Sequence, residues 1–265
     1  MSPIGEIESI WRYPVKSMRG ETLDEIFVSF AGVMGDRLYG IINGDGNRAF
    51  PWYTIRDYEA LLLYQPRYKN HSATLQPENL AAAQKMPPGI NSLYPDQNQF
   101  SVEVETPDSD VYSLENNDFL DHLKSLTGNQ NLSLHFSQRS QYDCRPLSIF
   151  SVEMRDLLVE ELGMNIDKRQ FRANFYVKWD DQSIDENDLV GHRLKIGDRL
   201  EINVLERDPR CKVITVNPDT AAVDSKLIKH IAQSHEGYAG VYGAVLVEGM
   251  VKAGDRIELL SRYRF

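Results

Sequence analysis

The sequence predicts a mainly β protein with a few helices, an α+β chain whose strands build barrels. Short segments rich in β-branched and aromatic residues recur along most of the chain and are separated by turn residues, as is typical of barrels and sandwiches. Only three segments place apolar residues at helical spacing. A length of 265 residues is enough for one large domain or two smaller ones.

The strands are predicted from near-alternation of apolar and polar residues. They cover residues 6–13, 22–30, 37–43, 101–104, 111–114, 132–136, 175–178, 193–196, 200–205, 213–216, 241–248 and 256–260. A strong turn signal, Asn-Gly-Asp-Gly-Asn, occupies residues 43–47. Residues 194–202 and 251–259 share the pattern Lys-x-Gly-Asp-Arg-apolar-Glu-apolar, which we interpret as two similar tight turns.

Helices are predicted over residues 117–127, 151–162 and 224–232. Ser151 is a good capping residue for the second helix. Residues 64–99 are irregular and contain Pro87-Pro88-Gly89, which indicates a long surface loop or a lid. We place the domain boundary after the first helix, which gives an N-terminal domain over 1–128 and a second domain over 129–265.

Composition excludes several classes of protein. A net charge of −10 argues against a nucleic-acid partner, which requires a basic face. The apolar runs are too short to cross a membrane, and no signal peptide is evident at the N-terminus. Two cysteines cannot form a disulfide framework, so we expect a cytoplasmic protein. The six histidines show no metal-binding spacing, so a histidine zinc site is not expected.

Cys211 is the residue with the most chemical promise. Arg207, Arg210 and Lys212 surround it in the sequence, and positive charge favours the thiolate, which is both a nucleophile and a soft metal ligand. A strand is expected directly after it. Composition alone nevertheless favours an ordinary structural thiol, because most lone cysteines are structural. Cys144 follows Asp143, which opposes thiolate formation, and is interpreted as structural.

Further residues could bind an anion or line a pocket, although each also has an ordinary structural explanation. Pro14 fixes a turn ahead of a Lys-Ser pair, two phenylalanines bracket an arginine, and glycines flank a tyrosine. These candidates are Lys16, Ser17, Arg37, Arg172, Asn174 and Tyr242. A surface pair with Asp36 is the alternative for the arginine at position 37, and core packing is the alternative for the tyrosine.

In order along the chain, these segments resemble the MOSC family in its two-part form, with a MOSC-associated N-terminal β-barrel domain. The resemblance is closest to the amidoxime-reducing members and their bacterial relatives. It covers nearly the whole chain. It rests on Tyr-Pro-Val-Lys-Ser (13–17), Asp-Arg-Leu-Tyr (36–39), Pro-Leu-Ser-Ile-Phe-Ser (146–151), Phe-Arg-Ala-Asn (171–174), Arg-Cys (210–211), Asn-Pro-Asp-Thr (217–220), Gly-Val-Tyr-Gly (240–243) and Val-Lys-Ala-Gly-Asp (251–255).

The resemblance implies a MOSC-type β-barrel domain behind a smaller N-terminal barrel, with a molybdenum cofactor between them. Cys211 would be the protein ligand of the molybdenum, beside the two sulfurs of the molybdopterin. The residues implied to bind or line the cofactor are Lys16, Ser17, Arg37, Ser151, Arg172, Asn174, Arg210 and Tyr242. The family usually has proline at Ala173, aspartate at Asn217 and glycine at Ala221, which puts details of the substrate pocket in doubt.

The function implied is an oxidoreductase that reduces small N-hydroxylated or N-oxide substrates. Electrons would come from a separate donor protein of the ferredoxin, flavoprotein or cytochrome type. The first alternative is a binding protein without reductase activity that carries the molybdenum cofactor, or a persulfide on Cys211. The second is a non-catalytic β-barrel interaction protein with a vestigial site.

Overall fold

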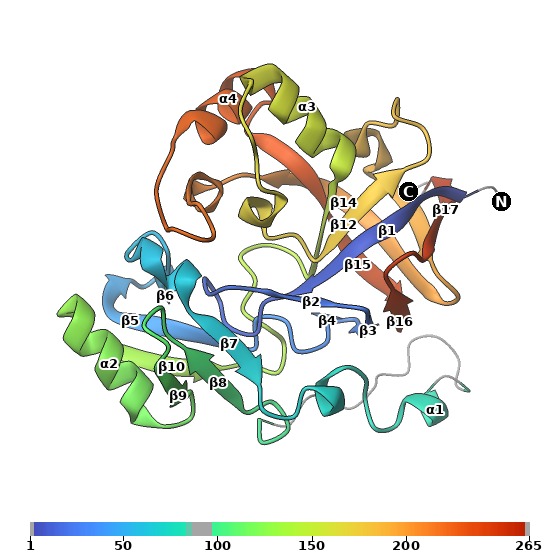
Figure 1. Ribbon diagram of the computed structural model, residues 1–265. Helices are drawn as coiled ribbons and strands as arrows, with labels where there is room; N and C mark the ends of the chain where they lie inside the picture. Colours follow the sequence, from blue (N-terminus) through green and yellow to red (C-terminus); the bar gives the residue numbers. More distant parts are fainter. Residues whose placement is uncertain (1–2, 84, 86–96, 263–265) are drawn as a thin grey trace.

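Seven strands close into a β-barrel in a computed structural model that describes residues 3–83, 85 and 97–262 (Figure 1). In order around the barrel they are β12 (Phe175–Trp179), β11 (Leu147–Ser151), β15 (Tyr238–Val247), β14 (Leu200–Pro209), β13 (His192–Ile196), β17 (Arg256–Arg262) and β1 (Pro3–Arg12). The strand β1 pairs with both β17 and β12, and the second pairing closes the ring. β2 (Glu21–Leu23) extends the sheet beside β1.

Apolar side chains fill the barrel. Ile7 and Ile10 on β1 are both buried in this core, although residues three apart point to opposite faces of a regular strand. The pairing of β1 with β12 shifts register between Ile7 and Ser9, which is a β-bulge. The bulge therefore lets both isoleucines face the interior.

Three smaller three-stranded sheets accompany the barrel, and two of them lie with α2 at the lower left of Figure 1. Their strands are β10 (Leu132–Phe136), β5 (Tyr39–Asn47) and β6 (Phe50–Tyr53); β7 (Gln65–Tyr68), β8 (Val102–Glu105) and β9 (Val111–Ser113); and β16 (Gly249–Lys252), β3 (Glu25–Ser29) and β4 (Gly32–Val33). α2 (Asn117–Thr127) buries Phe119 and Leu123 in the core that the first two sheets share.

Two longer helices, α3 (Val152–Leu162) and α4 (Lys226–Ser234), lie together at the top of Figure 1. Leu158 of α3 and Ile231 of α4 belong to one buried cluster that also contains Ile214. The shorter helices are α1 (Leu80–Ala83), η1 (Glu59–Leu63), η2 (Ser72–Thr74), η3 (Lys168–Phe171), η4 (Glu186–Leu189) and η5 (Lys212–Thr215).

Strand pairing crosses the boundary expected between residues 128 and 129. β1 comes from the N-terminal end of the chain yet completes the barrel, and β3 pairs with β16 near the C-terminal end. The two halves are therefore joined by backbone hydrogen bonds as well as by side chains. The division at residue 128 stays a prediction.

The predicted α+β class is confirmed, and the three predicted helices are present. α2 spans the predicted residues, and α3 begins one residue after its cap, Ser151. Both helices end at a glycine in the left-handed region, Gly128 and Gly163, which satisfies their last carbonyl groups. The third helix, α4, begins two residues later than predicted.

The strand predicted over residues 213–216 is wrong, because those residues lie in the 3₁₀ helix η5 and the residue that follows it. Their β-branched side chains suit a strand, but the backbone closes i to i+3 hydrogen bonds from Ile214 to Cys211 (3.3 Å) and from Val216 to Val213 (3.2 Å). The predicted strand 22–30 is divided into β2 and β3, with Asp24 between them.

The turn predicted at residues 43–47 lies further along, at Arg48 and Ala49, because β5 continues through the glycines to Asn47. In its described residues, the irregular segment 64–99 contains the strand β7, which pairs with β8, and the short helices η2 and α1. Its Pro87-Pro88-Gly89 motif lies outside the described residues. The two Gly-Asp turns are present at Gly197 and Gly254, each glycine with a positive φ.

Candidate functional site

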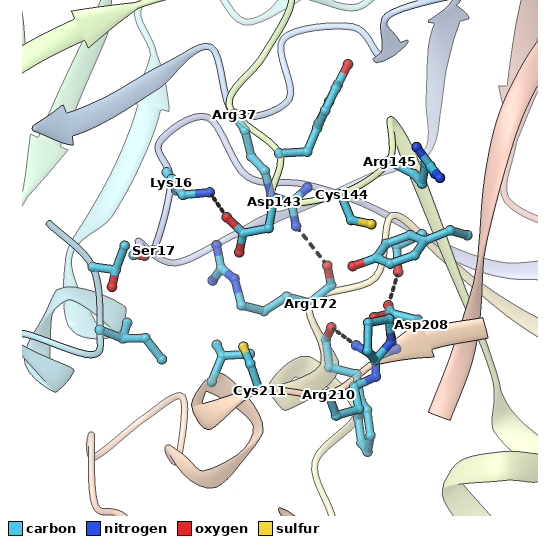
Figure 2. Close-up of a pocket in the computed structure, with 18 of the residues that line it drawn as sticks. Lys16, Ser17, Arg37, Asp143, Cys144, Arg145, Arg172, Asp208, Arg210 and Cys211 are labelled. Atoms are coloured by element: carbon cyan, nitrogen blue, oxygen red, sulfur yellow. Dashed lines mark hydrogen bonds and ion pairs between the residues drawn. The ribbon is translucent and has the colours of Figure 1, made fainter. Parts of the chain in front are cut away.

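A single pocket brings together nearly all of the residues that the sequence predicts for a cofactor site (Figure 2). Its volume is ≈ 410 Å³. It is lined by segments from both halves of the chain, the loops after β1 and before β5 on one side and the ends of η3 and β14 on the other. The predicted residues in its lining are Lys16, Ser17, Arg37, Arg172, Asn174, Arg210, Cys211 and Tyr242.

Positive charge is concentrated in this pocket, although the whole chain has a net charge of −10. The lining has two carboxylates, Asp143 and Asp208. Its cations are Lys16, Arg37, Arg56, Arg145, Arg172 and Arg210. Six cations against two carboxylates leave an excess of positive charge in the lining, part of it paired with Asp36 and Glu206 just outside, and this excess favours an anionic ligand.

Strained backbone accompanies three of the predicted residues. Ser17, Arg37 and Arg172 have φ values of 68°, 50° and 54°, in the left-handed region that L-residues rarely adopt. Each such residue costs roughly 1–2 kcal/mol relative to a right-handed conformation. Three neighbouring residues held in this way are typical of a functional site, where packing fixes side chains in a required position.

Cys211 follows β14 and precedes the first residue of η5, with a free and partly buried thiol. The turn behind it is held from inside the protein. Gln170 donates its side-chain amide to the Ile214 carbonyl (2.7 Å), and the Thr215 hydroxyl donates to the Lys212 carbonyl (2.7 Å). The sulfur is therefore carried on a fixed turn that faces the pocket.

Of the three cations near Cys211 in sequence, Arg210 lines the pocket and the other two do not. Lys212 forms an ion pair with Glu59 (2.6 Å), and Arg207 forms one with Glu236 (2.7 Å). Neither of these two residues lines the pocket. Apart from Arg210, the positive charge around the thiol comes from segments that are distant in sequence, so the local sequence accounts for only part of the basic environment.

Arg172 has a buried donor without a partner, and unlike Arg210 it has no carboxylate in an ion pair with it among the described residues. Its Nη1 donates to the Met18 carbonyl (2.7 Å), and its guanidinium lies over the Tyr13 ring at 4.2 Å from the centroid. Its Nη2 is buried and has no hydrogen-bond partner within the described residues. Burial lowers the pKa of Arg172 to about 10, so the group remains charged at neutral pH and can donate to a bound anion.

Arg37 lies on the same aromatic ring, 4.6 Å from the Tyr13 centroid. Arg37 pairs with Asp36, as the alternative interpretation of the sequence expected, but the pair is not on the surface. Asp36 is fully buried and Arg37 is mostly buried. Its Nη2 also donates to the Arg172 carbonyl (3.0 Å), which ties the two halves of the chain together. Burial opposes the charge of Arg37, but Asp36 outweighs it and the pKa is raised.

Lys16 is buried at the side of the pocket. Its Nζ donates to the Gln141 carbonyl (2.7 Å) and to the Asp143 carboxylate (Figure 2). Burial lowers the pKa of Lys16, and Asp143 acts in the opposite direction. Because Asp143 is half exposed, it could be displaced by a more strongly charged anion in the pocket.

Arg210 and Asn174 hold the walls of the pocket. Arg210 donates to the carbonyl groups of Ala239 and Phe171, and its Nη2 lies 2.8 Å from the Asp208 carboxylate. Asn174 joins two strands, since its amide donates to the Trp11 carbonyl (3.3 Å) and accepts from the Ser148 N–H (3.3 Å). Both therefore position the site more than they offer free donors.

Ser151 does not line the pocket, and the prediction that it would is wrong. Its hydroxyl accepts a hydrogen bond from the Met154 N–H (3.1 Å) at the start of α3, and its own N–H donates to the buried Glu186 carboxyl (2.8 Å). The hydroxyl therefore caps α3 and does not face the pocket.

Asp208 and Tyr242 are two groups in the pocket that could carry a proton. The sequence did not predict Asp208, and it predicted Tyr242 only as a lining residue. Asp208 is buried and accepts from the Ser148 hydroxyl (3.0 Å) and from Tyr242. Burial raises the pKa of Asp208, although Arg210 opposes the shift. Burial also raises the pKa of Tyr242. The available signal was the position of Asp208 three residues before Cys211, in the segment that already drew attention.

Cys144, interpreted as structural from sequence, also lines the pocket. It is exposed, and its thiol donates to the Glu206 carboxylate (3.5 Å). Burial and Glu206 together raise the pKa of the Cys144 thiol, which disfavours the thiolate. The pocket therefore contains two thiols in contrasting surroundings.

The three departures from the family pattern have local explanations. The Ala173 N–H donates to the Tyr176 hydroxyl (3.3 Å), a bond that proline could not make. Asn217 accepts from the N–H groups of Asp219 (2.9 Å) and Thr220 (3.1 Å), as an aspartate would. Ala221 has φ 57°, so alanine occupies a conformation that suits glycine.

Comparison with known families agrees with this arrangement. The MOSC N-terminal beta barrel domain matches residues 4–143, and the MOSC domain matches residues 131–258. The chain belongs to the MOSC family. The two matches together span the strands and loops that line the pocket.

Curated relatives include mitochondrial amidoxime reducing component 2 of Macaca fascicularis, 26% identical, with 85% of this chain and 71% of that protein covered. The human protein of the same name is 25% identical over 97% of this chain and 84% of its own length. Among solved structures, the YuaD protein from Bacillus subtilis has a TM-score of 0.48 and 15% identity, covering 98% of this chain and 97% of that chain.

None of the helices in the described part of the chain has the length and apolar character needed to cross a membrane.

Proposed function

We propose that this chain is a molybdenum-cofactor-dependent oxidoreductase that reduces N-hydroxylated or N-oxide compounds. The observation that carries the proposal is a cationic pocket, walled by both halves of an acidic chain, that contains the free thiol of Cys211. The relatives named as amidoxime reducing components supply the substrate class.

The residues fit an anionic, sulfur-rich cofactor. The buried Nη2 of Arg172 lacks a partner in the described part of the chain, which is costly unless a ligand accepts its hydrogen bond. Lys16 and Arg37 add charge from the N-terminal half of the chain, suited to a phosphate. A thiol is the ligand that a soft metal prefers, and Cys211 presents one from a fixed turn.

When bound, the cofactor would supply a redox-active molybdenum with two dithiolene sulfurs. The chain would contribute the Cys211 sulfur as ligand. Arg172, Arg37 and Lys16 would hold the phosphate and fix its orientation, and Arg210 would keep the Cys211 turn in place through its bonds to Phe171 and Ala239. On cofactor binding, Lys16 would either exchange Asp143 for the phosphate or keep its ion pair with Asp143 at the edge of the pocket.

The overall reaction consumes two electrons and two protons, and it converts an N-hydroxylated compound into its reduced form and water. We propose that Asp208 and Tyr242 hold one of these protons. Both line the pocket, and they are hydrogen bonded to each other. Burial raises the pKa of both groups, which favours the protonated form that an acid catalyst needs.

Electrons would come from a separate donor protein of the ferredoxin, flavoprotein or cytochrome type. We place the protein in the reducing cytoplasm, in keeping with its two free thiols. The substrate would be a small molecule, since the pocket of ≈ 410 Å³ must also receive the cofactor.

The test is to express the chain in a host that makes the molybdenum cofactor, and to measure molybdenum content and benzamidoxime reduction with a chemical electron donor. The proposal predicts close to one molybdenum per chain and turnover to benzamidine. A molybdenum-free protein would refute it. Bound molybdenum without turnover would favour the carrier function, and a persulfide on Cys211 in metal-free protein would favour sulfur transfer.

A further inference from the structure

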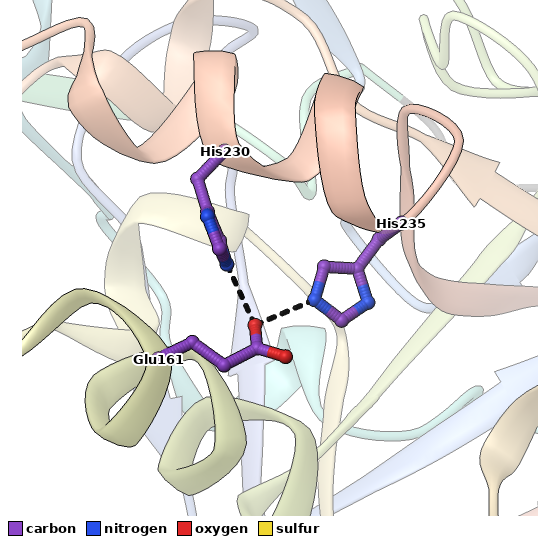
Figure 3. A group of neighbouring side chains, drawn as sticks. All are labelled: Glu161, His230 and His235. Carbon is purple, nitrogen blue, oxygen red and sulfur yellow. Dashed lines mark hydrogen bonds and ion pairs between the residues drawn. The ribbon is translucent and has the colours of Figure 1, made fainter.

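A second group of potential metal ligands lies between α3 and α4 (Figure 3). The Nε2 atoms of His230 and His235 each lie 2.7 Å from the same oxygen of Glu161. The three ligand atoms all fall within 4.8 Å of one another. Two histidines and one carboxylate, from two helices far apart in sequence, therefore converge on one point.

We propose that this cluster binds one divalent transition-metal ion, with zinc as the preferred ion. Imidazole nitrogen and carboxylate oxygen are common zinc ligands, at about 2.0–2.2 Å from the ion. A tetrahedral site with those bond lengths separates its ligand atoms by about 3.3 Å. Each histidine would need to move about 0.6 Å away from the Glu161 oxygen, which is within reach of side-chain rotation.

The surroundings also favour a cation. Glu161 lies in the last turn of α3 and His235 is the C-cap residue of α4, so the negative ends of both helix dipoles lie near the cluster, which His230 completes from the middle of α4. Neither helix has a basic residue in its last turn. A metal ion would supply the positive charge that lysine or arginine often supplies at such positions.

The cluster can be reached from solvent, and its three ligands leave one coordination position of a bound ion open. The exposed fractions of the side chains are 20% for His230, 17% for His235 and 30% for Glu161, so an ion can enter from solvent. Three protein ligands leave a fourth position for water. For the histidines to bind, each Nε2 must give up its hydrogen bond to Glu161 and carry its proton on Nδ1 instead.

A bound ion would fasten α3 to α4 over the buried cluster that contains Leu158, Ile231 and Ile214. Ile214 lies in η5, the turn that follows Cys211. The ion would therefore stabilise the support of the Cys211 turn without lying in the pocket. This inference is independent of the proposed function, because it requires neither the cofactor nor catalysis.

The experiment is calorimetric titration of zinc chloride into the full chain after dialysis against a chelator. We expect one zinc per chain, and a rise in the thermal midpoint of about 5 °C when zinc is present at a hundred times its Kd. Glu161→Gln, which keeps the shape of the side chain, and His235→Ala should each weaken binding at least about tenfold.

The matched control is His71→Ala. His71 also lies beside a carboxylate, 3.5 Å from Glu21, but without a second histidine, so its removal should leave zinc affinity unchanged. Cobalt(II) serves as a spectroscopic probe, and its spectrum should lack a thiolate-to-cobalt band. Absence of zinc binding, equal affinity in Glu161→Gln, or a thiolate band that assigns the ion to a cysteine would each overturn the proposal.

Discussion

The pocket has two walls that each present a cysteine, and they differ in how firmly the thiol is held. The Cys211 wall (residues 208–213) is fixed from inside by the bonds of Arg210 and by the bond from Gln170 to η5. The Cys144 wall (residues 142–145) is largely exposed, and its thiol donates to Glu206. A place in the pocket is therefore not enough to make a ligand.

Charge separates the two walls in the same direction. Glu206 accepts from Cys144 and also pairs with Arg145 (2.7 Å), so the arginine is engaged with the carboxylate that holds the thiol proton. On the opposite wall, Asp208 is engaged by Arg210 and by Ser148. The comparison teaches that a thiol held by a carboxylate, as Cys144 is by Glu206, is less available to a metal than one without such a bond among the described residues, as at Cys211.

The largest effect should come from replacing the cysteines. Cys211→Ser should lower benzamidoxime reduction at least about a thousandfold, because it removes a ligand of the metal itself. Cys144→Ser should retain activity within about twofold, since that thiol is held by Glu206. Equal losses in the two variants would remove the distinction between the walls.

The acids should differ next. Asp208→Asn should lower kcat about a hundredfold, the usual worth of a positioned acid. An acid must be protonated to act, so wild-type kcat should fall as pH rises through the pKa of Asp208, and burial moves that fall above the ordinary range of aspartate. Tyr242→Phe should weaken the same dependence, whereas Glu206→Gln should leave the pH profile of kcat unchanged. An unaltered profile in Asp208→Asn would exclude it as the acid.

The arginines allow a smaller and more specific comparison. Arg172→Lys should weaken cofactor binding about tenfold, because lysine loses both the stacking on Tyr13 and the second donor. Arg145→Lys, on the Cys144 wall, changes an exposed arginine and should leave occupancy unaltered. Molybdenum content at limiting cofactor measures both. A stronger effect of Arg145→Lys than of Arg172→Lys would place the phosphate beside the Cys144 wall and contradict the proposed cofactor position.

The smallest effect concerns the turn that follows the Cys211 wall. Ala221→Gly should raise the free energy of unfolding by about 0.5 kcal/mol, because glycine tolerates the left-handed φ of 57°. Ala222→Gly, one residue on and without a positive φ, should lower it by a similar amount. Urea denaturation distinguishes the two, and a loss of stability in Ala221→Gly would contradict the strain assigned there.

Local patterns were sufficient for the helices and for most strands. α2 and β10 match their predicted bounds, because apolar spacing and the terminal glycine of the helix are local signals. The same reasoning failed for residues 213–216, because β-branched residues suit both a strand and a buried turn. The hydrogen bond that fixes η5 comes from Gln170, 44 residues away in sequence, and leaves no local signal.

The site needed more than local sequence. The resemblance to a family brought Lys16, Arg37, Arg172 and Cys211 together, whereas two of the three basic neighbours of Cys211 in sequence pair with residues outside the pocket. No spacing rule could find the histidine cluster, because Glu161 lies 69 and 74 residues from His230 and His235. Contacts of this kind are set by how α3 packs on α4.

The most direct test of the central claim, that Cys211 and not Cys144 is the ligand, is X-ray absorption at the molybdenum edge. The account predicts three sulfur ligands in wild type and in Cys144→Ser, two from the cofactor and one from the protein. In Cys211→Ser it predicts one sulfur fewer, or loss of the metal. Three sulfurs retained in Cys211→Ser, or one lost in Cys144→Ser, would contradict it.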